Sequence, residues 1–150
     1  MTRWPAKPSW LKVVREPSAV MEMPRKVGAP IDAVRILRTH GAEEELVEVF
    51  YVLLLDAQNR VRGLQEVTRG TLNSTLVHPR EVFRLAIMHG AAGLIVAHNH
   101  PSGDPAPSAD DKAITAKLVE AGRLLDMPIY DHVIVGDDGR FFSFAEAGLI

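Results

Sequence analysis

The first regular pattern of hydrophobic positions begins near residue 29 and has the spacing of a helix. Pro30 suits the first turn of a helix, where a missing N–H group costs nothing, and Ile31, Val34 and Leu37 follow at intervals of three residues. Positions at this spacing share one face of a helix. Gly41 comes soon afterwards, at a point where a helix can end. The pattern therefore predicts a helix that begins at Pro30.

A continuous apolar run comes next, and it predicts the first strand of a β-hairpin. Val49–Leu55 is apolar throughout and stops at Asp56. The tetrapeptide Ala57–Arg60 is able to turn the chain, and Val61–Thr68 has the residues of a second strand. Together these segments predict two antiparallel strands.

A helix and a buried strand are predicted before a polar loop. Pro79 opens the helix and Gly90 closes it. The short apolar strand Gly93–Ala97 then runs directly into His98, and a proline-rich loop follows over Pro101–Pro107. A strand that is apolar at every position is typical of the interior of a sheet.

The last part of the chain predicts a third helix and two strands. The helix shows an apolar face at positions i, i+4, i+7 and i+11, formed by Ile114, Leu118, Ala121 and Leu125. Tyr130–Val135 and Arg140–Phe144 read as strands around the turn Asp137–Gly139. Residues 29–150 are therefore predicted to form a single α/β domain with a mixed sheet and helices against it.

Residues 1–28 differ from this domain. They contain four prolines, two tryptophans and several basic residues, and their apolar periodicity is weak. We interpret them as a loosely ordered basic arm with a short strand around Leu11–Val14. The interpretation favours a tail packed along its own domain over an arm that touches nucleic acid or a partner chain.

Composition narrows the possible chemistry. The 150-residue chain has no cysteine, which excludes disulfides, thiolate nucleophiles and cysteine-based zinc sites, including those of zinc nucleobase deaminases. Any metal must be held by nitrogen and oxygen ligands. A formal net charge of −2 gives no general attraction to nucleic acid. Because neither a secretion signal nor a membrane-spanning run is visible, we expect a cytoplasmic protein that does not bind membranes.

The stretch after the buried strand holds a candidate metal site. In an extended segment residues i and i+2 point to the same side, so His98 and His100 would present two imidazoles together. A catalytic zinc normally has three protein ligands, and Asp111 is the carboxylate we select as the third. Ser108 and Asp111 also have the spacing of a helix-capping pair, and both interpretations can hold together. Neither Asp104 nor Asp110 fits the spacing.

The full pattern H-x-H-x(7)-S-x-x-D is similar to the JAMM motif of the MPN+/JAB metallopeptidases. Several further segments resemble the bacterial RadC proteins, namely His98–Gly103, Gly70-Thr71 with His78–Glu81, and Asp131-His132. The resemblance covers about residues 29–150 and implies a mostly antiparallel mixed sheet flanked by helices. Longer RadC proteins carry an additional N-terminal helix-hairpin-helix region, so we expect this chain to be a short, stand-alone form.

The resemblance also implies the roles of individual residues. It implies one zinc ion per chain, held by His98, His100 and Asp111 with water as the fourth ligand, and a peptide or protein substrate cleaved at an amide or isopeptide bond. Glu48 is the glutamate at the family's position for the general base, with Glu66 as the alternative, and Ser108 would stabilise the oxyanion.

Other interpretations remain open at this point. His132 is interpreted as a buried histidine with satisfied hydrogen bonds rather than as a partner of a ligand. The RadC resemblance carries a link to DNA repair, so nucleic-acid binding is an alternative function. A scaffold without peptidase activity is another, although all the ligands are present. The triplet His98-Asn99-His100 does not indicate an HNH nuclease, whose residues are spread along a ββα unit.

Overall fold

The fold is known from a computed structural model that describes residues 26–70 and 77–150. The elements in chain order are α1 (Pro30–Thr39), a short 3-10 helix (Ala42–Glu44), β1 (Val49–Leu55), β2 (Val61–Arg69), α2 (Pro79–Met88), β3 (Gly93–Asn99), α3 (Ala109–Leu124), β4 (Ile129–Val135) and β5 (Phe141–Ser143). Every predicted helix and strand within the described ranges is present. The strand predicted around residues 11–14 lies outside them, and the division into arm and domain stays a prediction.

One five-stranded sheet forms the centre of the domain, in the order β2-β1-β3-β4-β5. All neighbouring pairs are antiparallel except β3 and β4, which are parallel. The parallel pair is connected by α3, as expected because parallel strands need a long crossover. The mixed, mostly antiparallel sheet that the sequence led us to expect is therefore confirmed.

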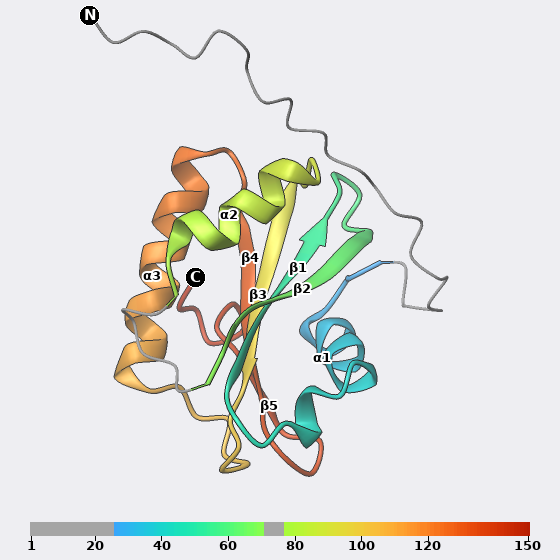
Figure 1. Ribbon diagram of the computed structural model, residues 1–150, viewed down its shortest axis with the longest axis vertical. Coiled ribbons are helices and arrows are strands. Elements are labelled where there is room, and N and C mark those ends of the chain that lie inside the picture. The colour runs from blue at the N-terminus through green and yellow to red at the C-terminus, as the bar shows by residue number, and fades with distance from the viewer. Residues whose placement is uncertain (1–25, 71–76) are drawn as a thin grey trace, which may run out of the picture.

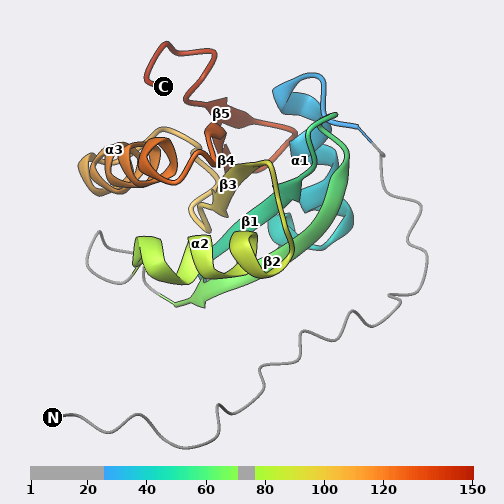
Figure 2. The ribbon, with the colours of Figure 1, turned by 90° about the horizontal axis from the view of Figure 1, so that it is seen from above.

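The helices cover the sheet on both faces, which gives three layers (Figures 1 and 2). One apolar cluster joins α1 to alternate residues of β1, including Tyr51 and Leu53. The other residues of the strand, including Phe50 and Val52, pack with α2 and α3 on the opposite face. All of β1 and β3 is buried, which explains why both strands read as continuous apolar runs.

Two details differ from the sequence prediction. The strand β3 continues to Asn99, so His98 lies within it instead of following it. In α3 the buried positions are Asp111, Ile114, Thr115, Leu118 and Gly122, whereas Leu125, which was placed on the apolar face, is 47% exposed. The inward face of α3 is therefore partly polar, and its polar end lies toward the predicted metal site.

None of the helices in the described ranges combines the length and apolar character needed to cross a membrane.

Candidate metal centre

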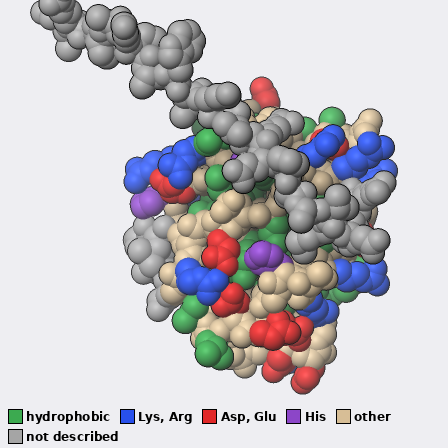
Figure 3. All heavy atoms as spheres, turned by 45° about the vertical axis from the view of Figure 1, so that its right-hand side comes forward, with side chains coloured by type: hydrophobic (Ala, Val, Ile, Leu, Met, Phe, Trp, Pro, Cys, Tyr) green, Lys and Arg blue, Asp and Glu red, His purple; other side chains and the backbone are tan. Residues whose placement is uncertain are grey.

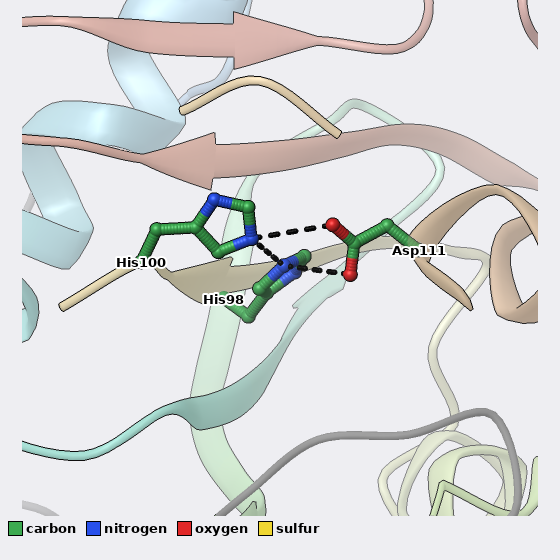
Figure 4. A group of neighbouring side chains, drawn as sticks. All are labelled: His98, His100 and Asp111. Atoms are coloured by element: carbon green, nitrogen blue, oxygen red, sulfur yellow. Dashed lines mark hydrogen bonds and ion pairs between the residues drawn. The ribbon is translucent and has the colours of Figure 1, made fainter. Parts of the chain in front are cut away.

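Three metal-binding side chains converge where β3 ends and α3 begins. The Nε2 atoms of His98 and His100 lie 3.0 Å apart. The Oδ1 atom of Asp111 is 3.1 Å from Nε2 of His98, and its Oδ2 atom is 3.2 Å from Nε2 of His100. In Figure 4 the His98 ring projects from β3 and the His100 ring from the coil that directly follows it, and the carboxylate of Asp111 faces both rings from the start of α3. The structure thus brings together the three residues predicted as ligands.

The two histidines lie side by side because of the strand that carries them. His98 is paired with Phe50 of β1 and Ile134 of β4, so its backbone is held on both sides. Just beyond β3, the backbone N–H of His100 donates to the carbonyl of Val135, 3.0 Å away. Since side chains alternate along extended backbone, both imidazoles point to the same face of the sheet.

Helix capping brings Asp111 to the same place. Ser108 is the N-cap of α3, and its hydroxyl oxygen accepts the backbone N–H of Asp111 at 3.0 Å. In return the N–H of Ser108 donates to Oδ2 of Asp111 at 2.8 Å. This reciprocal pair satisfies two groups at the helix start and aims the carboxylate at the histidines. The capping interpretation is therefore confirmed alongside the clustering of the ligands.

Electrostatics within the cluster favour a carboxylate beside a positive charge. Burial opposes ionisation of Asp111, but the contacts of its carboxylate with His100, His98 and the backbone N–H of Ser108 outweigh this effect and hold the pKa of the carboxyl well below its usual range. The same bond to Asp111 raises the pKa of His100 against the effect of burial, and the negative charge of Glu48 adds to this. The cluster thus attracts one cation, which is a proton on His100 or a metal ion.

The geometry and the chemistry of the donor atoms suit a zinc ion. With metal–ligand bonds of about 2.0–2.1 Å, neighbouring ligands of a tetrahedral zinc lie roughly 3.3 Å apart. The two Nε2 atoms are 3.0 Å apart, and each lies 3.1–3.2 Å from a different oxygen of the Asp111 carboxylate. Two imidazoles and one carboxylate are a common ligand set for catalytic zinc, which leaves a position open for substrate or water. The residues present therefore fit the metal that the family resemblance implies.

The loop after His100 fixes the orientation of its ring. The Nδ1 atom lies 2.7 Å from the carbonyl of Asp104 and must donate to it, because a carbonyl can only accept. The loop is held in turn at the carbonyl of Gly103, which accepts the backbone N–H of Asp137 and a guanidinium N–H of Arg140, both at 3.0 Å. With Nδ1 protonated, the Nε2 lone pair of neutral His100 faces the cluster.

The two candidate general bases lie on opposite faces of the sheet. Glu66 of β2 is paired with Tyr51 of β1, whose side chain packs on the α1 face of the sheet. The carboxylate of Glu66 forms an ion pair with Arg69 at 2.5 Å. Glu48 directly precedes β1, so alternation places it on the face of Phe50. The Phe50 ring stacks on His98 with a centroid distance of 6.1 Å. Of the two glutamates, Glu48 is therefore the one on the side of the metal cluster.

Three polar residues around the centre were not assigned a role in it from the sequence. His132 is fully buried, as predicted, but its Nε2 atom is also 2.8 Å from Nδ1 of His98. Thr115 binds the other nitrogen of His132. Asn99 binds the backbone on both sides of Glu48. The position of Thr115, four residues after Asp111, is a signal that sequence reasoning could have used, because such residues share a helix face.

Comparisons with known proteins agree with the architecture. A family model described as a RadC-like JAB domain matches residues 27–149. A UPF0758 protein of Trichlorobacter lovleyi is 50% identical over 111 residues, which cover 74% of this chain and 48% of the relative. A UPF0758 protein of Methanosarcina mazei is 44% identical over 131 residues, or 87% of this chain and 56% of the relative. The chain thus spans about half the length of these curated relatives, whose names state no activity.

Proposed function

Because this chain belongs to the RadC family and carries its JAB-like domain, we propose that it is a zinc-dependent hydrolase that cleaves an amide or isopeptide bond in a protein or peptide. The observation that supports this most strongly is the convergence of His98, His100 and Asp111 within 3.2 Å of one another. These residues would hold the metal. When bound, zinc acts as a Lewis acid and lowers the pKa of a coordinated water to about 7.

Glu48 would act as the general base. It directly precedes β1 on the face of the metal cluster, and its charge contributes to the raised pKa of His100. In this role its carboxylate accepts a proton from the attacking water and returns it to the leaving amine. Glu66 lies on the far face of the sheet and is ion-paired with Arg69, which favours Glu48 for this role.

Ser108 would donate a hydrogen bond to the oxyanion that forms during amide hydrolysis. Its oxygen is the acceptor for the N–H of Asp111, so this bond does not use the hydroxyl hydrogen. Ser108 is exposed, which allows a substrate to reach it. Loss of a comparable donor costs roughly 10²–10³ in rate.

The charge distribution favours a peptide over a nucleic acid as the partner. On the face in Figure 3 the basic side chains lie in several separate groups, with acidic side chains among and between them. Most of the described arginines are ion-paired with carboxylates, namely Arg35, Arg38, Arg62, Arg69, Arg80, Arg84 and Arg140. Such pairs weaken the attraction to phosphates on which nucleic-acid binding depends.

The test is cleavage of peptide and isopeptide libraries by zinc-loaded protein, compared with two matched variants. Glu48→Gln should retain zinc and lose activity, because the amide cannot accept the proton. Glu66→Gln removes the same charge from the opposite face and should leave activity near that of the wild type. The proposal fails if the zinc-loaded wild type cleaves nothing, or if its activity is matched by the Glu48→Gln variant.

A further inference from the structure

A buried histidine connects two of the proposed metal ligands. His132 of β4 is completely buried, with the Phe144 ring stacked on it at a centroid distance of 4.7 Å and Phe50 against it edge-on at 5.6 Å. Its Nε2 atom lies 2.8 Å from Nδ1 of His98, and its Nδ1 atom lies 2.5 Å from the hydroxyl of Thr115. Both ring nitrogens are therefore hydrogen-bonded, and packing fixes the ring between its partners.

The direction of each hydrogen bond follows from the bond that the Thr115 hydroxyl makes to the backbone. The Thr115 hydroxyl donates to the main-chain carbonyl of Asp111 at 2.6 Å. Since a hydroxyl has a single hydrogen, Thr115 must accept the bond from Nδ1 of His132. His132 is completely buried against the Phe144 and Phe50 rings, and its ring nitrogens bind only an imidazole and a hydroxyl, so the imidazole is neutral. A neutral imidazole carries only one N–H. The Nε2 atom of His132 is then an acceptor.

The same reasoning shows which ring nitrogen of His98 carries the hydrogen. Because Nε2 of His132 accepts, Nδ1 of His98 must carry a hydrogen and donate it. The Nε2 atom of His98 is then left with a free lone pair, and this is the atom that faces Asp111 and His100. A metal ligand needs that lone pair.

We propose that Thr115 and His132 are positioning residues that hold His98 in its metal-binding tautomer, through a relay that begins at the main-chain carbonyl of Asp111. The proposal rests on the zinc site of the proposed function. It also gives the two histidine ligands different supports, since His100 is oriented directly by the carbonyl of Asp104. The relay joins Asp111 on α3 to His98 on β3, so the two ligands are coupled through the protein.

The matched variants are Thr115→Val and Thr115→Ser. Valine has nearly the shape of threonine but no hydroxyl, so His132 loses the acceptor that keeps its hydrogen on Nδ1. Serine retains the hydroxyl and is able to bond the carbonyl four residues earlier. Loss of an outer partner of a metal ligand typically weakens metal affinity about 10–100-fold. We expect that loss in Thr115→Val, and near wild-type affinity in Thr115→Ser, by zinc titration against a chromophoric chelator.

Imidazole ¹⁵N chemical shifts of the metal-free proteins supply a second measurement that needs neither zinc nor activity. In the wild type and in Thr115→Ser, His98 and His132 should each carry their hydrogen on Nδ1, whereas Thr115→Val should shift both toward the Nε2-protonated form. The wild-type spectrum alone overturns the proposal if His132 is protonated at Nε2, even if the valine variant does not fold.

The outcomes separate this proposal from the proposed function. If the wild type binds zinc and Thr115→Val binds it equally well with unchanged tautomers, the relay is refuted and the zinc site stands. If the wild type binds no zinc but shows the expected tautomers, the zinc function fails, while the arrangement of hydrogen bonds is upheld. Equal weakening of zinc binding in Thr115→Val and Thr115→Ser would also refute the relay, because it would reflect packing instead of the hydroxyl.

Discussion

Replacing Asn99 by alanine should both destabilise the domain and impair catalysis. Asn99 lies between the two histidine ligands, and alternation points its side chain away from them. Its Oδ1 atom accepts the N–H of Val49 at 2.7 Å, and its Nδ2 group donates to the carbonyl of Val47 at 2.9 Å. These two bonds hold the backbone on either side of Glu48. Alanine removes both of them at once.

The magnitude follows from the burial of the two partners. Val49 is completely buried, so its N–H group would be left unsatisfied at a cost of about 1–3 kcal/mol. Val47 is 41% exposed, so its carbonyl can be hydrated and the loss there is smaller, about 0.5–1 kcal/mol. The free energy of unfolding of the variant should therefore be lower by about 1.5–4 kcal/mol.

The assay is urea unfolding of the metal-free proteins, followed by zinc titration and the cleavage assay with the zinc-loaded forms. Because the metal ligands themselves are unchanged, zinc affinity should fall far less than the cleavage rate. Asn99→Asp is the matched variant: it keeps the acceptor for Val49 but sets a second oxygen against the Val47 carbonyl, and it should also be destabilised. A loss of stability below about 0.5 kcal/mol in Asn99→Ala, the range of neutral surface substitutions, would show that the two hydrogen bonds of Asn99 do not stabilise the domain.

Further predictions concern the loop, an unpaired hydroxyl and pH. Gly136→Ala should lower the free energy of unfolding by about 1–3 kcal/mol, because the added Cβ would collide with the carbonyl oxygen of Gly103. An unchanged melting temperature would contradict this prediction. Tyr51→Phe should leave stability unchanged or raise it by up to about 1 kcal/mol, because the Tyr51 hydroxyl is buried without a hydrogen-bond partner; clear destabilisation in urea would contradict this. Zinc affinity should increase as pH rises through and above about 6.5. The reason is that the pKa of metal-free His100 is raised, so a zinc ion must compete with a proton for this side chain. Calorimetric titrations that give the same zinc affinity at low and high pH would contradict this prediction.

Local patterns were sufficient to predict the elements and the ligand cluster. The run Val49–Leu55 coincides with β1 because a strand buried on both faces has no polar positions to obscure it. His98 and His100 share a side because alternation depends only on local backbone geometry. Asp111 follows from the helix start that Ser108 caps.

What could not be predicted depends on how distant strands align. His132 reaches His98 only because β3 and β4 are parallel in the register that pairs Val96 with His132. A shift of one residue would turn His132 to the other face. The placement of Glu66 has the same origin, because the pairing of β1 with β2 sets it opposite Tyr51 on the far face. Such registers are set by tertiary packing, which no single segment encodes.

Elemental analysis of the purified protein is the decisive test of whether His98, His100 and Asp111 hold a metal ion. Wild-type protein purified without chelator should contain one zinc ion per chain, and so should metal-free protein that is afterwards titrated with zinc. The double variant His98→Ala/His100→Ala should contain none. A wild type that carries no metal and takes up none on titration would show that these three residues do not form a metal site.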